Sequence, residues 1–222
     1  MEWWFIAFLK IMIINLILSG DNAIVIAMAS KNLPEKQRKM AIFWGAFGAV
    51  FLRILLTLVA IYLLQIPFLT AIGAVLLLWI AVKLIVDEED HSTIKAHSHL
   101  GSVVMTIVVA DFVMSLDNVI AITAVAEGEI LLISIGLILS IPLIIWGSSI
   151  ILSLIHKFPF LIYLGSAILG FTAGEMLLND QEVLSLFEDL QTFLHLLPYL
   201  AAFLVVLIGW GLNQAKPSGK SI

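Results

Sequence analysis

The chain contains no cysteine, and only 12% of its 222 residues are charged. The absence of cysteine excludes disulfide bonds, thiolate metal sites and cysteine nucleophiles. A soluble domain has about a quarter of its residues charged and about half apolar, whereas this chain is 62% hydrophobic with a mean hydropathy of +1.13. The net charge is only −5, and no basic run suggests nucleic-acid binding. The composition therefore predicts an all-α integral membrane protein with several spans.

Apolar segments of the length that a bilayer requires recur along the whole chain. A transmembrane helix needs about 20 apolar residues. The seven segments that qualify are 3–29, 41–64, 67–86, 101–126, 130–154, 158–178 and 193–212. Glu2 stands where a signal peptide has basic residues, so we expect the first segment to be retained as a span. We predict one membrane domain over residues 1–212, followed by a tail at 213–222.

Lysine and arginine occupy the loops on only one side of this predicted topology. The loops after the first, third and fifth spans and the C-terminal tail contain Lys31, Lys36, Arg38, Lys39, Lys95, Lys157, Lys216 and Lys220. The opposite loops are acidic, with Glu127, Glu129, Asp180, Glu182, Glu188 and Asp189. Because basic loops remain in the cytoplasm, we expect a multi-pass cell-membrane protein with an external N-terminus and a cytoplasmic C-terminus.

The longest predicted cytoplasmic loop, residues 87–100, is acidic and contains His91, His97 and His99. Such side chains are metal ligands, so a regulatory or metal-funnelling role is one interpretation. A solvated connector is the other, since that is the usual role of a charged loop.

Two predicted spans carry the same polar interruption. It is "LSGDNAIVIA" at residues 18–27 and "MSLDNVIAI" at residues 114–122. The residues that align are Ser19 with Ser115, Asp21 with Asp117, Asn22 with Asn118, and Asn15 with Asp111. A matched Ser-x-Asp-Asn inside two apolar spans indicates an internal duplication.

The third spans of the two halves are also similar. The shared positions are Pro67 and Pro159, Phe68 and Phe160, Leu69 and Leu161, Gly73 and Gly165, and Ala81 and Ala173. A repeat of three spans enters the membrane from the opposite side the second time. We therefore predict a 3+3 inverted repeat, residues 3–86 and 101–178, plus a seventh helix at 193–212. Secondary transporters use this architecture, with the substrate site near the midplane.

Charged residues inside the predicted spans mark the functional site. A charge at the bilayer centre costs about 2.5–3.5 kcal/mol, and such residues face the protein interior or a cavity. The candidates are Asp21, Arg53, Asp111 and Asp117, with Lys83 and Glu175 nearer the span ends. Acids outnumber bases in this set, so a bound cation or bound protons must supply positive charge.

The spacing of the polar residues indicates a cation site. Asp111, Ser115 and Asn118 fall on one helical face, and Gly20 would let the first helix unwind so that Asp21 turns inward. Hard oxygen ligands suit Mg²⁺, Ca²⁺ or Mn²⁺ better than Cu⁺ or Zn²⁺. The predicted ligands are Asp21, Asp111, Asp117, Asn22, Asn118, Asn15 and Ser115, with Arg53 and Glu175 as counter-ion or coupling groups.

Two other interpretations of these polar residues compete with a cation site. The same polar residues can form structural hydrogen bonds between helices. Two membrane aspartates can also share a proton in an intramembrane protease, but Leu18 and Met114 stand where such enzymes need the first glycine of G-x-G-D.

The stretches "SGDNAIVIAMASKNLP" and "DFVMSLDNVIAITAV" resemble the paired signatures of the TerC family of integral membrane proteins, in particular its short YjbE/YkoY branch in Gram-positive bacteria. The resemblance covers about residues 4–210. It implies efflux of divalent metal, chiefly manganese, and supply of metal to secreted enzymes. It also implies that Asp21, Asp111 and Asp117, with Asn22 and Asn118, are the motif positions.

The expected function is therefore secondary export of Mn²⁺ across the lipid bilayer, by proton antiport or down the metal gradient. The chain is not expected to be an enzyme or to need a resident cofactor, and no G-x-x-x-x-G-K-[ST] motif occurs. The alternatives are export of Ca²⁺ or Mg²⁺, and a non-transporting partner of the secretion machinery.

Overall fold

The computed structural model describes residues 20–63, 66–86, 100–125, 130–186 and 194–215. For residues 60–61, 117–125, 130 and 132–133 it describes the backbone alone. Over these ranges the chain forms helices and no strand. The helices are α2 (Gly20–Ser30), α3 (Glu35–Leu63), α4 (Leu69–Val86), α5 (Leu100–Val125), α6 (Ile130–Lys157), α7 (Leu161–Asn179), α8 (Gln181–Leu186) and α10 (Leu197–Ala215).

Five of the described helices are long and apolar enough to cross a membrane, namely α3, α4, α6, α7 and α10. Helix α5 is apolar over Leu100–Leu116, a shorter stretch. The first predicted span is described only from Gly20 onward, and the loop with His91, His97 and His99 lies outside the described residues. The prediction of an all-α, multi-pass membrane protein is confirmed in this form.

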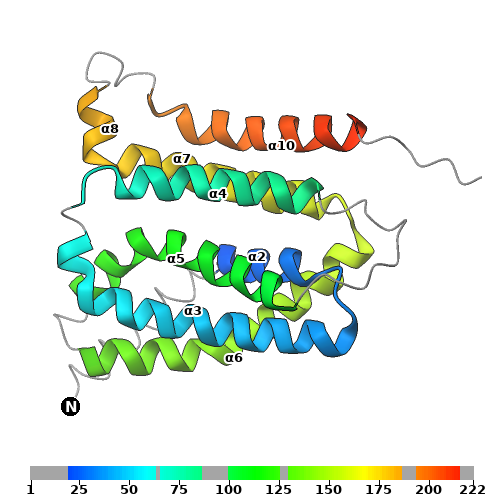
Figure 1. Ribbon diagram of the computed structural model, residues 1–222, viewed down its shortest axis with the longest axis horizontal. Coiled ribbons are helices and arrows are strands. Elements are labelled where there is room, and N and C mark those ends of the chain that lie inside the picture. The colour runs from blue at the N-terminus through cyan, green and yellow to red at the C-terminus, as the bar shows by residue number, and fades with distance from the viewer. Residues whose placement is uncertain (1–19, 64–65, 87–99, 126–129, 187–193, 216–222) are drawn as a thin grey trace, which may run out of the picture.

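The long helices lie side by side, and successive ones run in opposite directions (Figure 1). Helix α10 packs on α7 and α4, which in turn face α2 and α5. Helices α3 and α6 cover the opposite side of α2 and α5. This arrangement places α2 and α5, the two helices that carry the Asp-Asn motifs, inside the bundle.

Contacts between helices come in corresponding pairs. Helix α3 packs on α5, as α6 packs on α2; helix α4 packs on α5, as α7 packs on α2. Gly73 and Gly165, which align in the sequence, lie at the contacts of α4 with α5 and of α7 with α2. A Cβ on Gly73 of α4 would meet Val113 of α5, and a Cβ on Gly165 of α7 would meet Met28 and Ile24 of α2.

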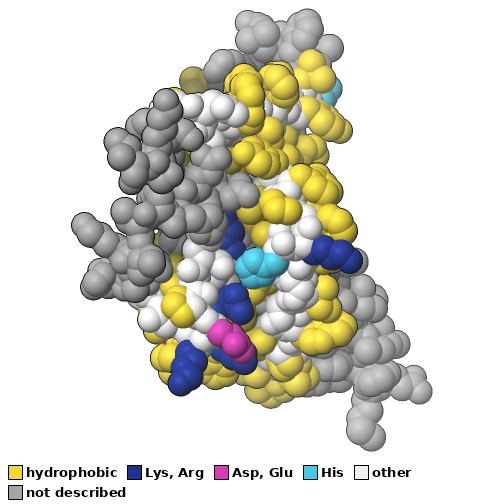
Figure 2. All heavy atoms as spheres, turned by 90° about the vertical axis from the view of Figure 1, so that its right-hand side faces the viewer, with side chains coloured by type: hydrophobic (Ala, Val, Ile, Leu, Met, Phe, Trp, Pro, Cys, Tyr) yellow, Lys and Arg dark blue, Asp and Glu magenta, His cyan; other side chains and the backbone are white. Residues whose placement is uncertain are grey.

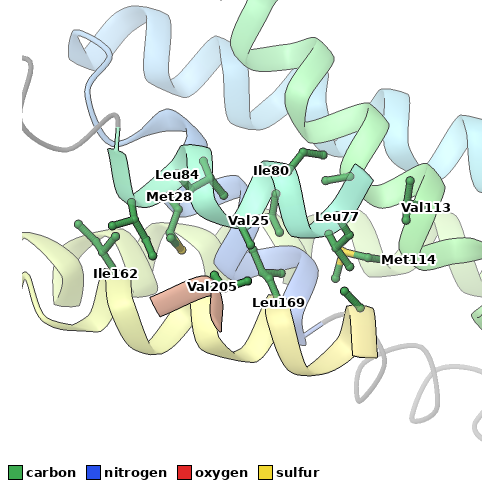
Figure 3. Close-up of a cluster of buried hydrophobic side chains, with 14 of the residues drawn as sticks. Val25, Met28, Leu77, Ile80, Leu84, Val113, Met114, Ile162, Leu169 and Val205 are labelled. Atoms are coloured by element: carbon green, nitrogen blue, oxygen red, sulfur yellow. The ribbon is translucent and has the colours of Figure 1, made fainter. Parts of the chain in front are cut away.

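A single apolar cluster fills the space between α2, α4, α5, α7 and α10 (Figure 3). Leu77 and Leu169, from the middle of α4 and α7, are fully buried in it. Val25 from α2 and Val205 from α10 join the same cluster. Removing such a side chain costs about 2–5 kcal/mol in a tightly packed core. The interior around α4 and α7 is therefore apolar and close-packed.

Proline residues precede α4 and α7, and a glycine of α7 lies where α10 packs against it. Pro67 and Pro159 precede α4 and α7, and neither would supply an intrahelical N–H there. Helix α10 approaches α7 closely, because a Cβ on Gly174 would collide with the backbone of Pro198. Small residues at a helix crossing permit such backbone contact in membrane proteins.

Basic side chains gather at one end of the bundle, where α2, α4, α6 and α10 end (Figure 2). Lys36, Arg38 and Lys39 lie at the start of α3, and Lys157 ends α6. Lys31, which the predicted topology puts in the loop after the first span, is buried. Its Nζ donates a hydrogen bond of 3.1 Å to the carbonyl oxygen of Leu84. It lies there because the last carbonyls of α4 have no partner within the helix.

Candidate functional site

An arginine lies at the centre of the apolar bundle. Arg53 projects from the middle of α3 and has only 1% of its surface exposed. Apolar residues precede and follow it in α3, and the helix itself continues without a break to Leu63. A guanidinium stays charged under all ordinary conditions, so its burial requires partners that supply negative charge and hydrogen-bond acceptors.

Helix α5 supplies those partners. Nη2 of Arg53 donates to Oδ1 of Asp111 at 2.7 Å, and its Nε donates to Oγ of Ser115 at 2.8 Å. Oγ of Ser115 donates in turn to Oδ2 of Asp111 at 3.1 Å. Asp111 and Ser115 meet because they are one helical turn apart on the predicted face. Arg53, Asp111 and Ser115 thus form a buried group in which each side chain is hydrogen-bonded to the other two.

The first Asp-Asn motif lies next to this ion pair. The described part of α2 begins about half-way along the bundle, beside α5 (Figure 1). Asp21 interacts electrostatically with both Arg53 and Asp111. One of its oxygens, Oδ1, accepts a hydrogen bond of 2.8 Å from the backbone N–H of Asn22. A second carboxylate, from α2, therefore adds negative charge to the surroundings of the Arg53–Asp111 pair.

The side-chain amide of Asn22 is buried in α2. Its side chain has 3% of its surface exposed, and among the described residues neither Nδ2 nor Oδ1 has a hydrogen-bond partner. An unsatisfied buried polar group costs about 1–3 kcal/mol. Each such group in a native structure calls for an explanation, for example an ion that the side chain binds. Asn22 Oδ1 is therefore an oxygen ligand available beside Asp21.

Only part of the predicted ligand set lies within the described side chains. Asn15 falls outside the described residues, and Asp117 and Asn118 are described in backbone only. Across the side chains that the structure does describe, no group of three acidic, histidine or cysteine residues lies together. Glu175 is exposed on α7. From Gly20 onward α2 is regular helix, so any unwinding at the motif would have to precede that residue.

Two basic residues bear on the charge balance of the predicted spans, Lys10 and Arg53. Lys10 falls inside the first predicted span and adds a positive charge to the set considered above. It lies outside the described residues. Arg53 was predicted to be a counter-ion or coupling group, and the structure pairs it with Asp111, a partner that the sequence left open. The deficit of positive charge is therefore smaller than the sequence argument supposed.

The site combines a balanced ion pair with unbalanced oxygen ligands. Arg53 and Asp111 form a buried ion pair, and Asp21 of α2 interacts electrostatically with both. The amide of the adjacent Asn22 has no hydrogen-bond partner among the described residues. Carboxylate and amide oxygens are ligands that Mg²⁺, Ca²⁺ and Mn²⁺ accept. The described residues can thus contribute two to three oxygen ligands from two helices, with charge to hold a cation in a low-dielectric interior.

Comparison with known proteins places the chain in a family. Residues 1–217 match the family described as "Integral membrane protein TerC family". The chain is 47% identical over 204 residues to the "Uncharacterized membrane protein YjbE" of Bacillus subtilis (strain 168), which covers 92% of this chain and 94% of that protein. From the same organism, YceF is 29% identical over 75% of this chain and 68% of its own length, and YkoY is 28% identical over 73% and 56%.

No solved structure shows significant similarity to the chain. The family match spans almost the whole chain and includes both Asp-Asn motifs. The resemblance seen in those motifs is confirmed, and the chain belongs to the integral membrane protein TerC family.

Proposed function

We propose that this protein is a secondary transporter that exports divalent cations, with Mn²⁺ as the main substrate. The observation that carries the proposal is the buried amide of Asn22, unpartnered among the described residues and adjacent to the carboxylate of Asp21. Ionisable residues at this depth in a membrane protein usually mark an ion or substrate pathway. In this proposal the protein is a carrier rather than an enzyme, and the metal is its substrate rather than a resident cofactor.

The remaining ligands come from both repeats. Asp21, Asn22 and Asn15 belong to the first motif, and Asp117, Asn118, Asp111 and Ser115 belong to the second. The electrostatic interaction between Asp21 and Asp111 supports a shared site. The choice of Mn²⁺ over Ca²⁺ or Mg²⁺ follows from the family resemblance alone, and metal supply to secreted proteins is part of the same proposal.

An inverted 3+3 repeat would give this site its two-sided access. Support comes from the opposite directions of α2 and α5, of α3 and α6, and of α4 and α7 (Figure 1). The corresponding helix contacts, in which α4 packs on α5 as α7 packs on α2, support the same relation. Rocking of one repeat against the other would then expose the site to each side in turn.

The proposed orientation places the basic end of the bundle in the cytoplasm and the start of α6 outside. The chain has no cysteine, so a single introduced cysteine can be labelled without background. A cysteine at Ser218 is expected to stay unlabelled in intact cells by an impermeant reagent and to react after permeabilisation. Labelling of that cysteine in intact cells would reverse the orientation.

The decisive experiment measures metal flux in purified proteoliposomes with a metal indicator and a pH dye inside. We expect Mn²⁺ movement coupled to counter-movement of protons, because clustered carboxylates that lose a cation in low dielectric take up protons. Metal movement without proton movement would reject the antiport and keep the transporter. Equal or faster flux of Ca²⁺ or Mg²⁺ would reassign the substrate, and no flux of any metal would favour a non-transporting partner of the secretion machinery.

A further inference from the structure

Arg53 already makes hydrogen bonds to two of the groups proposed as metal ligands. Both oxygens of Asp111 accept a hydrogen bond, one from Nη2 of Arg53 and the other from Oγ of Ser115. Oγ of Ser115 also accepts from Nε of Arg53. The guanidinium thus supplies positive charge at the position where the proposed function puts the transported cation.

We propose that Arg53 is a tethered cation that competes with the transported divalent ion for Asp111 and Ser115. The inference rests on the proposed function. In the absence of metal, Arg53 pairs with Asp111 as described above. When metal binds, it takes the Asp111 carboxylate and the guanidinium moves aside; when metal leaves, the guanidinium returns.

Electrostatics in the bundle interior require such an exchange. A divalent ion on Asp111 would lie within a few ångströms of the guanidinium, and like charges repel strongly where the dielectric is low. Conversely, an ionised Asp111 that loses its metal cannot remain buried alone at low cost. An arginine that alternates with the metal keeps the charge beside Asp111 compensated throughout the cycle, and it does so at any pH because guanidinium does not deprotonate.

The position of Arg53 suits this role. It belongs to α3, whereas the ligands belong to α2 and α5, so its side chain can move while the ligand helices stay in place. Helix α3 is held tightly against α5 nearby, because a Cβ on Gly45 would come within 2.8 Å of Ile107. The long arginine side chain, rather than the helix, therefore provides the movement.

The experiment compares Mn²⁺ affinity of the wild type and Arg53→Gln in lipid nanodiscs, with free Mn²⁺ measured by electron paramagnetic resonance. Glutamine retains a hydrogen-bond donor but not the charge. We expect Mn²⁺ to bind at least about ten-fold more tightly, a typical size of coupling between interacting sites. Arg38→Gln is the matched control, since Arg38 is the other arginine of the chain. It lies near the start of α3, away from the site, and its replacement should leave the affinity unchanged.

A second measurement uses the wild type in case Arg53→Gln does not fold. Labelling arginine with ¹⁵N yields Nε signals from Arg38 and Arg53 only. A diamagnetic ion, Cd²⁺ or Ca²⁺, whichever displaces Mn²⁺ in the binding assay, is then added. We expect the Arg53 signal to shift, because its Nε loses the Ser115 oxygen, while the Arg38 signal stays in place.

The outcomes separate this inference from the proposed function. Folded Arg53→Gln with unchanged or weaker Mn²⁺ affinity, or an Arg53 signal that metal does not move, overturns the competition. Wild-type protein that binds Mn²⁺ without transporting it refutes the export function, and the competition is then judged on the binding data alone. Wild-type protein that binds no divalent cation refutes both.

Discussion

Helices α4 and α7 bury corresponding residues. Gly73 and Leu77 of α4 align with Gly165 and Leu169 of α7, and all four are buried where these helices pack. Ala81 and Ala173 continue the correspondence, each with no exposed surface. The third helices therefore use their shared sequence for packing.

Helices α2 and α5 use their shared motif differently. Asp111 of α5, which aligns with Asn15, is bound by Arg53. Asn22 of α2 has no partner among the described residues. Around α5 the polar residues are bound by a fixed cation, whereas in α2 the amide oxygen of Asn22 has no partner among the described residues. Similar packing of α4 and α7 thus coexists with different polar surroundings in the neighbouring helices α2 and α5.

The largest expected effect is on Mn²⁺ flux and comes from removing the charge of Asp21 in α2. Asp21→Asn keeps an oxygen but loses the carboxylate beside Asn22, so we expect Mn²⁺ flux in proteoliposomes to fall by about 100-fold or more, as loss of a ligand exceeds the effect of losing a supporting residue. Asp117→Asn should act alike through the second motif. Glu182→Gln on the exposed helix α8 is the control, and wild-type flux in both aspartate variants would reject the site.

The second effect is on the stability of the protein and concerns the buried ion pair of Arg53 and Asp111. Arg53→Met leaves Asp111 buried without its cation, and breaking a buried ion pair costs about 3–5 kcal/mol. The double variant Arg53→Met/Asp111→Leu should recover most of that stability, since replacing both partners by apolar residues is often neutral. Thermal unfolding followed by tryptophan fluorescence measures both. A double variant no more stable than Arg53→Met would show that the pair is not an isolated unit.

A smaller effect tests how alike the packed helices are. A Cβ on Gly165 would lie 2.7 Å from Sδ of Met28, whereas a Cβ on Gly73 would lie 3.1 Å from the nearest atom of Val113. Alanine gains about 1 kcal/mol over glycine in a helix, and overpacking costs about 1–3 kcal/mol. We expect Gly165→Ala to lower the free energy of unfolding and Gly73→Ala to leave it nearly unchanged. The reverse order would contradict the packing described for α7 on α2.

The smallest effect lies at the turns before α4 and α7, where the corresponding residues differ in backbone conformation. Phe68 has a positive φ of 59°, whereas Phe160 has a φ of −56°. We compare the free energies of unfolding of the alanine and glycine variants at each position. Phe68→Gly should be more stable than Phe68→Ala by about 1 kcal/mol. Phe160→Gly should be less stable than Phe160→Ala by about 0.5–1 kcal/mol. Changes of the same sign at both positions would count against this difference.

Much of the fold follows from local sequence. Length and apolarity of the spans predict helices that cross a bilayer, and α3, α4, α6, α7 and α10 have that character. Pro67 and Pro159 mark helix starts because proline has no N–H and fixes its own φ. The first span and the histidine-containing loop stay predictions, because they lie largely or wholly outside the described residues.

The partners within the site did not follow from sequence. Helical spacing placed Asp111 and Ser115 on one face, since those residues share one helix. It gave no means of choosing which aspartate Arg53 would bind, because Arg53 is in another helix and long-range pairing depends on how α3 packs against α5. The burial of Lys31 against the end of α4 was missed for the same reason.

Sequence alone determined that this chain is a helical membrane protein of the TerC family with two related Asp-Asn motifs, because apolarity, helical spacing and motif identity are local properties. Only the tertiary structure decided that Asp111 is neutralised by Arg53 while the amide of Asn22 is left unpartnered among the described residues. Charge pairing in a low-dielectric interior depends on distances of a few ångströms between helices, and those distances are fixed by the packing of side chains that lie far apart along the chain.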